Sequence, residues 1–156
     1  MRLLRSQKQT LLLATVNEDG SAEASVAPYL EQEGSFYIFV SELARHTRNM
    51  RQQSAATTLF IEDENEASNP FSRRRLSYRC RVTEVKREDA NYALFLDLME
   101  KRFGKLLQTL RQLPDFHLLQ LQPQSGHYVS GFARAYTLNL SGSDGGIHPK
   151  TRSWTP

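Results

Sequence analysis

Cysteine is nearly absent from this chain of 156 residues, in which Cys80 is the single example. This excludes a disulfide within the chain and a cluster of thiolate metal ligands, and it favours a reducing cytoplasm. Long apolar runs are missing as well, because the stretch 11–16 is far shorter than a membrane span. No apolar segment follows the basic N-terminal residues, as it would in a signal peptide. We therefore expect a cytoplasmic protein without a membrane segment.

Common catalytic motifs are also missing. The chain has no Gly-x-Ser-x-Gly elbow, no Walker loop and no dinucleotide fingerprint. The histidines form no close-spaced pair, which argues against a structural zinc site. They are His46, His117, His127 and His148. Any redox chemistry would therefore come from a bound cofactor.

The composition is that of one ordinary globular domain. Hydrophobic residues make up 39% and charged residues 24%, which excludes a disordered chain. The formal net charge is only +3. Acidic residues at 62–66 directly precede basic residues at 73–81. Acidic and basic residues thus alternate in blocks along the chain, and the sequence does not indicate a single basic surface. We therefore expect no nucleic-acid partner.

Apolar and alternating segments, separated by turn residues, predict a fold of mostly antiparallel strands. The expected strands are 11–17, 22–30, 36–40, 57–62, 75–86, 116–122 and 126–138. Pro28 indicates an edge or a bulge, and residues 123–126 are expected to form a turn. Two helical regions are expected, one at 42–53 capped by Ser41 and one at 89–113 interrupted near Gly104.

These elements indicate the α+β class with mainly β structure, in the form of a closed or partly closed antiparallel barrel with flanking helices. The barrel domain is expected to cover residues 1–140. Residues 141–156 are rich in glycine, serine and proline, and this composition predicts a flexible C-terminal tail.

The segment from Ser41 to Arg48 has the composition of an anion site. Here an expected helix start coincides with Arg45, His46, Thr47 and Arg48. Free N–H groups and the positive end of a helix, together with arginines, suit a phosphate or carboxylates. An ordinary capped helix with a solvated basic face would give the same pattern, so both interpretations stay open.

The run Arg73-Arg74-Arg75 has the same ambiguity. Alternation along a strand sends Arg74 to one face and its two neighbours to the other, so at least one guanidinium should face a core or a ligand. The planar fork of arginine matches carboxylate or phosphate oxygens. A solvated strand face is the alternative.

Eight segments between residues 10 and 138 resemble a known family in composition and order. They are Leu13-Ala14-Thr15-Val16, Ala27-Pro28-Tyr29, Ser41-Glu42-Leu43-Ala44-Arg45-His46-Thr47-Arg48-Asn49, Ile61-Glu62-Asp63-Glu64, Phe71-Ser72-Arg73-Arg74-Arg75-Leu76, Arg102-Phe103-Gly104, Asp115-Phe116-His117-Leu118 and Gly131-Phe132-Ala133-Arg134-Ala135-Tyr136. The chain is similar to the haem-utilisation (heme oxygenase-like) branch of the pyridoxamine 5'-phosphate oxidase-related FMN-binding split barrels.

This resemblance implies a homodimer with two equivalent cofactor sites at the subunit interface. The site would hold FMN in the broad superfamily and haem in this branch, where some members open haem to release iron. By the family pattern, His148 in the short tail would bind the iron and Asp115 would hydrogen-bond that histidine. His46 and Arg75 would lie near the cofactor, and the arginines, Arg73 among them, would offset propionates or phosphate.

Three functions remain open on this basis. The first is a haem-degrading oxygenase that takes electrons from an unidentified reductant, with Asp115 and Arg75 in catalytic roles. The second is an FMN-binding oxidoreductase that uses the segment from Ser41 to Arg48 for the phosphate. The third is a haem carrier without catalytic activity.

Overall fold

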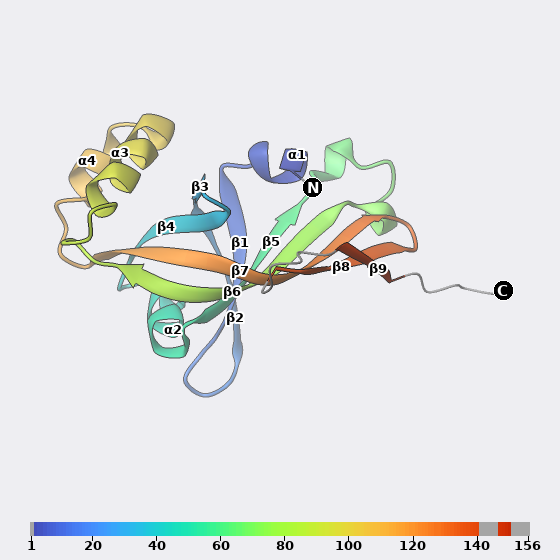
Figure 1. The fold of residues 1–156 in the computed structure, drawn as a ribbon, viewed down its shortest axis with the longest axis horizontal. Coiled ribbons are helices and arrows are strands. Elements are labelled where there is room, and N and C mark those ends of the chain that lie inside the picture. Colours follow the sequence, from blue (N-terminus) through green and yellow to red (C-terminus); the bar gives the residue numbers. More distant parts are fainter. Residues whose placement is uncertain (1, 141–146, 151–156) are drawn as a thin grey trace.

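The computed structural model describes the backbone of residues 2–140 and 147–150 and the side chains of residues 4–140. In this part of the chain nine strands form one antiparallel sheet in the order β2-β1-β5-β6-β7-β4-β3, with β8 on β7 and β9 on β8 (Figure 1). The strands are β1 Thr10–Val16, β2 Ala22–Pro28, β3 Leu30–Gln32, β4 Ser35–Ser41, β5 Ala55–Ile61, β6 Arg75–Val85, β7 Phe116–Gly131, β8 Arg134–Asn139 and β9 Ile147–Lys150.

The sheet curls into a split barrel because its two end strands are consecutive in the chain. Only Tyr29 separates β2, which pairs with β1, from β3, which pairs with β4. Pro28 ends β2 at this bend, where its missing N–H removes no ladder bond. A strand that changes partners at a bend is a usual corner of such barrels. The predicted barrel is confirmed, and so is the edge predicted at Pro28, because β2 is the end strand of the order.

The barrel interior is filled from the alternate residues of its strands. In β1 and β5 every second side chain is buried, as expected for a sheet with one face on a core. Aromatic rings of Tyr29, Phe36, Phe60 and Tyr78 meet there with centroids 5.2–6.4 Å apart. Such contacts stabilise beyond their buried area.

Strand β4 is buried on both faces because two helices cover its outer side. These are α3 Tyr92–Phe103 and α4 Leu106–Leu110, and they pack on Tyr37 and Phe39. The break between them falls at Gly104, whose φ of +96° favours glycine. The predicted interruption at Gly104 is therefore confirmed. The cover of α3 and α4 also explains why the sequence of β4 is continuously apolar.

The predicted turn at residues 123–126 is wrong, because β7 runs without interruption through this segment. Pro123 lies at a register shift against β6, between Arg79 and Cys80. Gly126 provides space rather than a turn, since a Cβ there would lie 2.9 Å from Cδ1 of Tyr78. The chain reverses instead after Gly131, where Ala133 takes a φ of +57°.

This close approach predicts that Gly126→Ala destabilises the fold. The added methyl group would also lie 3.1 Å from Cδ1 of Leu138, so two core side chains would have to move. Overpacking of this kind costs about 1–3 kcal/mol. Urea unfolding followed by circular dichroism measures the loss, with Ser130→Ala on the same strand as control. An unchanged midpoint would show that Tyr78 moves aside freely.

The remaining elements are short. They are α1 Arg2–Ser6, α2 Arg45–Gln53 and the 3-10 turns η1 Glu64–Glu66 and η2 Pro70–Ser72. No helix in the described residues is long and apolar enough to cross a membrane. In Figure 1 the far half of β7 extends away from the barrel with β8 and β9, while α3 and α4 lie at the opposite end.

The predicted division into a barrel and a tail stays a prediction. Residues 141–146 and 151–156 lie outside the described part of the chain. Between them, β9 pairs with β8 along Ala135–Leu138.

Candidate functional site

Ser41 does not cap the helix that follows it, which corrects the prediction. Helix α2 begins three residues later than expected, after Ala44, which makes no side-chain capping bond. The hydroxyl of Ser41 instead donates to Oδ2 of Asp115 at 2.8 Å and accepts from the N–H of Leu43 at 3.1 Å. The N–H of Glu42 donates to the carbonyl of Asp115 at 2.8 Å. Two predicted site residues therefore lie in direct contact.

Polar groups from β2 engage the first residues of α2. Nδ1 of His46 lies 2.8 Å from Oγ of Ser25, and Arg45 forms an ion pair of 3.4 Å with Glu23. Thr47 is fully buried, and Arg48 is exposed. The start of α2 is thus lined by two carboxylates, those of Asp115 and Glu23, which disfavour a bound phosphate.

Burial of the imidazole lowers the pKa of His46 below its ordinary value of 6.5, and the charge of Glu23 offsets part of this. The unfolded chain therefore takes up a proton first as pH falls. The stability that the neutral imidazole contributes is fully present above the ordinary pKa of 6.5, and it is lost as the pH falls toward the lowered pKa of the folded protein.

We accordingly predict that His46→Asn reduces the acid sensitivity of the fold. Between about pH 7.5 and about pH 5 the urea midpoint should fall less in the variant than in the unmodified protein. His127→Asn is the control, because His127 is exposed. Equal losses in His46→Asn and the unmodified protein would contradict the lowered pKa.

Two of the three consecutive arginines hold a loop. Nε of Arg74 donates to the buried carboxylate of Glu62 at 2.8 Å, and this hydrogen bond lowers the pKa of Glu62. Arg73 donates to the carbonyl of Glu62 and to Glu64, each at 3.0 Å. Neither guanidinium is free for a ligand, contrary to the prediction for Arg73. Arg75 is exposed and has no carboxylate partner among the described residues.

The outward side of the sheet carries an unusual combination of side chains. We define the outer face as the outward residues of β1, β2, β5 and β6. Leu12 is 42% exposed there, next to Val26 on β2 and Leu59 on β5. Arg75, Arg79 and Arg81 project from the same side of β6. An apolar area therefore adjoins a row of arginines.

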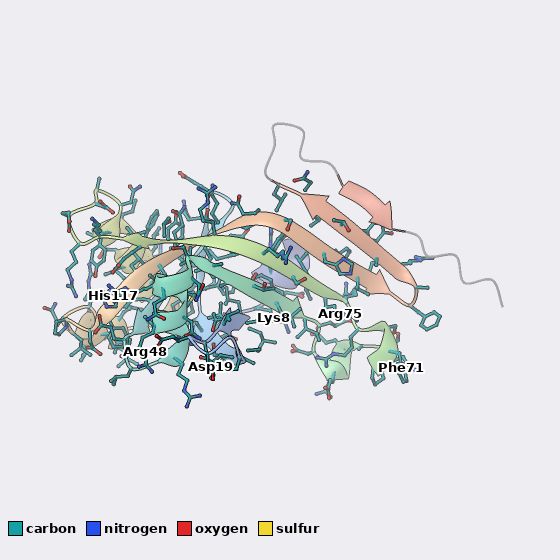
Figure 2. All side chains as sticks on the ribbon, turned by 90° about the horizontal axis from the view of Figure 1, so that it is seen from below. Lys8, Asp19, Arg48, Phe71, Arg75 and His117 are labelled. Atoms are coloured by element: carbon teal, nitrogen blue, oxygen red, sulfur yellow. The ribbon has the colours of Figure 1, made fainter. Side chains whose placement is uncertain are left out.

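The two groups of predicted residues lie at opposite ends of β7. Ser41 pairs with Phe116, whereas Arg75 pairs with Val129. Thirteen residues of extended strand between Phe116 and Val129 correspond to about 40 Å. Figure 2 agrees, with Arg48 and His117 at one end of the molecule and Arg75 at the other. A single chain does not bring these groups together.

His148 lies on the Arg75 side of this division. Its backbone pairs with Thr137 of β8, which pairs with His127 of β7; its side chain is outside the described part. His127 is eleven residues from Phe116 along β7, or roughly 35 Å. This pairing places the backbone of His148 far from Asp115 within one chain, and the bond expected between the two residues stays a prediction.

Sequence reasoning missed an ion cluster beside the Ser41 segment. The imidazole of His117 contacts Glu42 through Nε2 at 2.6 Å and Glu84 through Nδ1 at 2.5 Å. Arg51 lies 3.0 Å from Glu42 and 3.4 Å from Glu84. The cluster joins α2, β6 and β7, which are far apart in sequence, so no local pattern indicates it.

Comparisons with known proteins identify the family. The family model described as pyridoxamine 5'-phosphate oxidase matches residues 1–130. Heme oxygenase HutZ of Vibrio cholerae serotype O1 is 36% identical over 140 residues, which are 90% of this chain and 78% of HutZ. A crystal structure of Vibrio cholerae HutZ, described as a heme storage protein, has a TM-score of 0.73 at 34% identity, over 78% of this chain and 86% of that one.

The crystal structure of Campylobacter jejuni ChuZ has a TM-score of 0.79 at 28% identity, over 93% of this chain and 62% of that one. All but the last of the segments that predicted the resemblance thus fall within the residues that the family model matches, and the fold matches as well. The chain therefore belongs to the pyridoxamine 5'-phosphate oxidase family, in the branch that contains HutZ.

Proposed function

We propose that this protein binds haem and degrades it oxidatively, at sites shared by the two subunits of a homodimer. The observation that carries the proposal is the outer face, where exposed apolar side chains adjoin arginines that have no carboxylate partner in the described part of the chain. Haem is flat, largely apolar and bears two propionate carboxylates, so it matches both halves of this surface. The likeness to HutZ, which is named a heme oxygenase, supports the same choice.

The separation of the predicted residues supports the dimer. Asp115 and His148 are roughly 35 Å apart along one chain (from strand spacing), so a site that uses both needs one from each subunit. The exposed Leu12 and Val26 offer an apolar surface for the second copy. A stable interface of this kind buries about 2,000 Å² or more.

Each proposed site residue has a distinct task. His148 of one subunit would hold the iron, and Asp115 of the other would accept its second N–H, which fixes the tautomer and raises the basicity of the ligand. Ser41 holds the Asp115 carboxylate in place. Arg75 would pair with a propionate. Bound haem supplies the iron centre for oxygen chemistry, with electrons from an external reductant.

Two alternatives remain as outcomes to test. The description of HutZ as a heme storage protein supports a carrier without turnover. FMN is the cofactor implied by the wider family. At the start of α2 the phosphate of FMN would be repelled by the carboxylates of Asp115 and Glu23. This repulsion disfavours FMN and so favours haem.

The absorption spectrum during titration with hemin tests the function. We expect a saturable Soret band of a histidine-ligated ferric haem, and its decay when ascorbate is added in air. A yellow protein absorbing near about 450 nm that gains no Soret band would contradict the proposal. A Soret band that persists after ascorbate is added would show haem binding without degradation, and it would support the carrier function.

We further predict that Arg75→Ala weakens hemin binding without unfolding the protein. Loss of a hydrogen bond to a charged group costs about 1.5–3 kcal/mol. Lys101→Ala removes one positive charge from the exposed end of α3, outside the outer face, and serves as control. Unchanged affinity of Arg75→Ala for both hemin and FMN would return Arg75 to a solvated strand face.

A further inference from the structure

The outer face of β6 contains a second arginine with features of a ligand site. Arg79 lies four residues beyond Arg75 and projects from the same side of the strand. It is exposed and makes no ion pair within the described residues. Arg45, which is also exposed, pairs with Glu23, whereas Arg79, like Arg75, has no carboxylate partner in the described part of the chain.

Hydroxyl groups flank Arg79 on both sides. Thr57 is its partner on β5 and Ser125 its partner on β7. Directly paired residues of antiparallel strands project to the same side, so the side chain of Arg79 leaves the sheet between two residues that carry hydroxyls. Neither hydroxyl has a hydrogen-bond partner among the described groups. By contrast, Arg75 has Ile61 and Val129 as its neighbours.

An irregularity of the sheet falls next to this group. The register between β6 and β7 shifts between Arg79 and Cys80, with Gln124 as the extra residue of β7 beside Ser125. Such bulges redirect side chains and are frequent near functional sites. Arg79, Thr57 and Ser125 therefore stand where the sheet geometry changes.

We propose that Arg79, Thr57 and Ser125 form a second carboxylate site that pairs with Arg75 to bind the two propionates of one haem. This deepens the proposed function and rests on it. The Cα atoms of Arg75 and Arg79 are about 13 Å apart by strand spacing, and only the small Ser77 lies between them on that side. On binding, the two long side chains would lean over Ser77 toward two carboxylates, with Arg75 leaving its 3.4 Å contact to the carbonyl of Arg73. The Thr57 and Ser125 hydroxyls would donate to the carboxylate at Arg79.

Binding of hemin and of hemin dimethyl ester, which lacks both carboxylate charges, tests the proposal. We expect Arg79→Ala to weaken hemin binding about tenfold or more, as for a lost charged hydrogen bond, and to leave the ester unaffected. Thr57→Val removes a hydroxyl at constant shape and should weaken hemin about threefold. Lys101→Ala, which removes a positive charge from the exposed end of α3 outside the outer face, is the control and should change neither affinity.

The outcomes separate this inference from the function on which it rests. Wild-type protein that takes up neither hemin nor the ester contradicts haem binding itself. Wild-type binding of hemin with an unchanged affinity in Arg79→Ala overturns the inference alone. An equal loss of affinity for hemin and for the ester in Arg79→Ala would also overturn it, because the arginine would then act on the fold. Dissociation of the Arg79→Ala dimer in sedimentation would overturn it as well, because the arginine would then act on the interface.

Discussion

Replacement of Leu12 by arginine is expected to convert the protein to monomers and to abolish saturable haem binding at the same time. Leu12 lies centrally on the outer face, between Val26 and Leu59. A charge buried there would lack a partner. A two-fold interface contains each residue twice, so a loss of about 2 kcal/mol per copy weakens the dimer roughly a thousandfold.

Sedimentation at micromolar concentration measures the first effect, and hemin titration of the same sample measures the second. Leu94→Arg is a suitable control because Leu94 is 53% exposed on α3, away from the outer face. A dimeric Leu12→Arg protein would place the interface elsewhere. A monomer that still binds hemin with full affinity would show that one chain makes the whole site.

Replacement of His148 by alanine should abolish the histidine-type ferric haem spectrum. Neutral imidazole is the expected axial ligand, and removal of the tail, residues 141–156, should have the same effect. The barrel should survive truncation, because β9 pairs with β8 alone. Asp115→Asn should leave haem bound but change turnover with ascorbate, since it weakens the bond that orients the ligand, while the amide oxygen can still accept the Ser41 hydroxyl.

The truncated protein provides the sharper comparison for this prediction. An unaltered spectrum after truncation would make the tail a bystander. His46 would then be the remaining candidate ligand, since its Nε2 is not engaged in the hydrogen bond to Ser25.

Local patterns were sufficient for most strands and for the break at Gly104, because burial on one face imposes a period of two on the sequence. Local patterns failed where the same residue type can have either of two structural roles. Gly126 has the composition of a turn, but its role is to admit the ring of Tyr78. Ser41 has the composition of a cap, but it bonds Asp115, which is 74 residues away.

The candidate site was predictable as a set of residues and not as an arrangement. Sequence alone indicated Arg73, Arg74 and Arg75 together. Only the fold separates the two that bind Glu62 from Arg75, which has no carboxylate partner among the described residues. The same holds for Asp115 and His148, whose distance along β7 follows from strand pairing. Such contacts depend on register between distant segments, which no local spacing encodes.

A hybrid dimer tests the central claim, that each haem site takes His148 from one subunit and Asp115 from the other. Subunits carrying His148→Ala and Asp115→Asn are produced together with different tags, and the mixed dimer is purified. A shared site predicts one fully intact site per hybrid, with about half of the wild-type turnover and one histidine-ligated haem. Turnover equal to the average of the two parent variants would contradict it, because each site would then belong to a single chain.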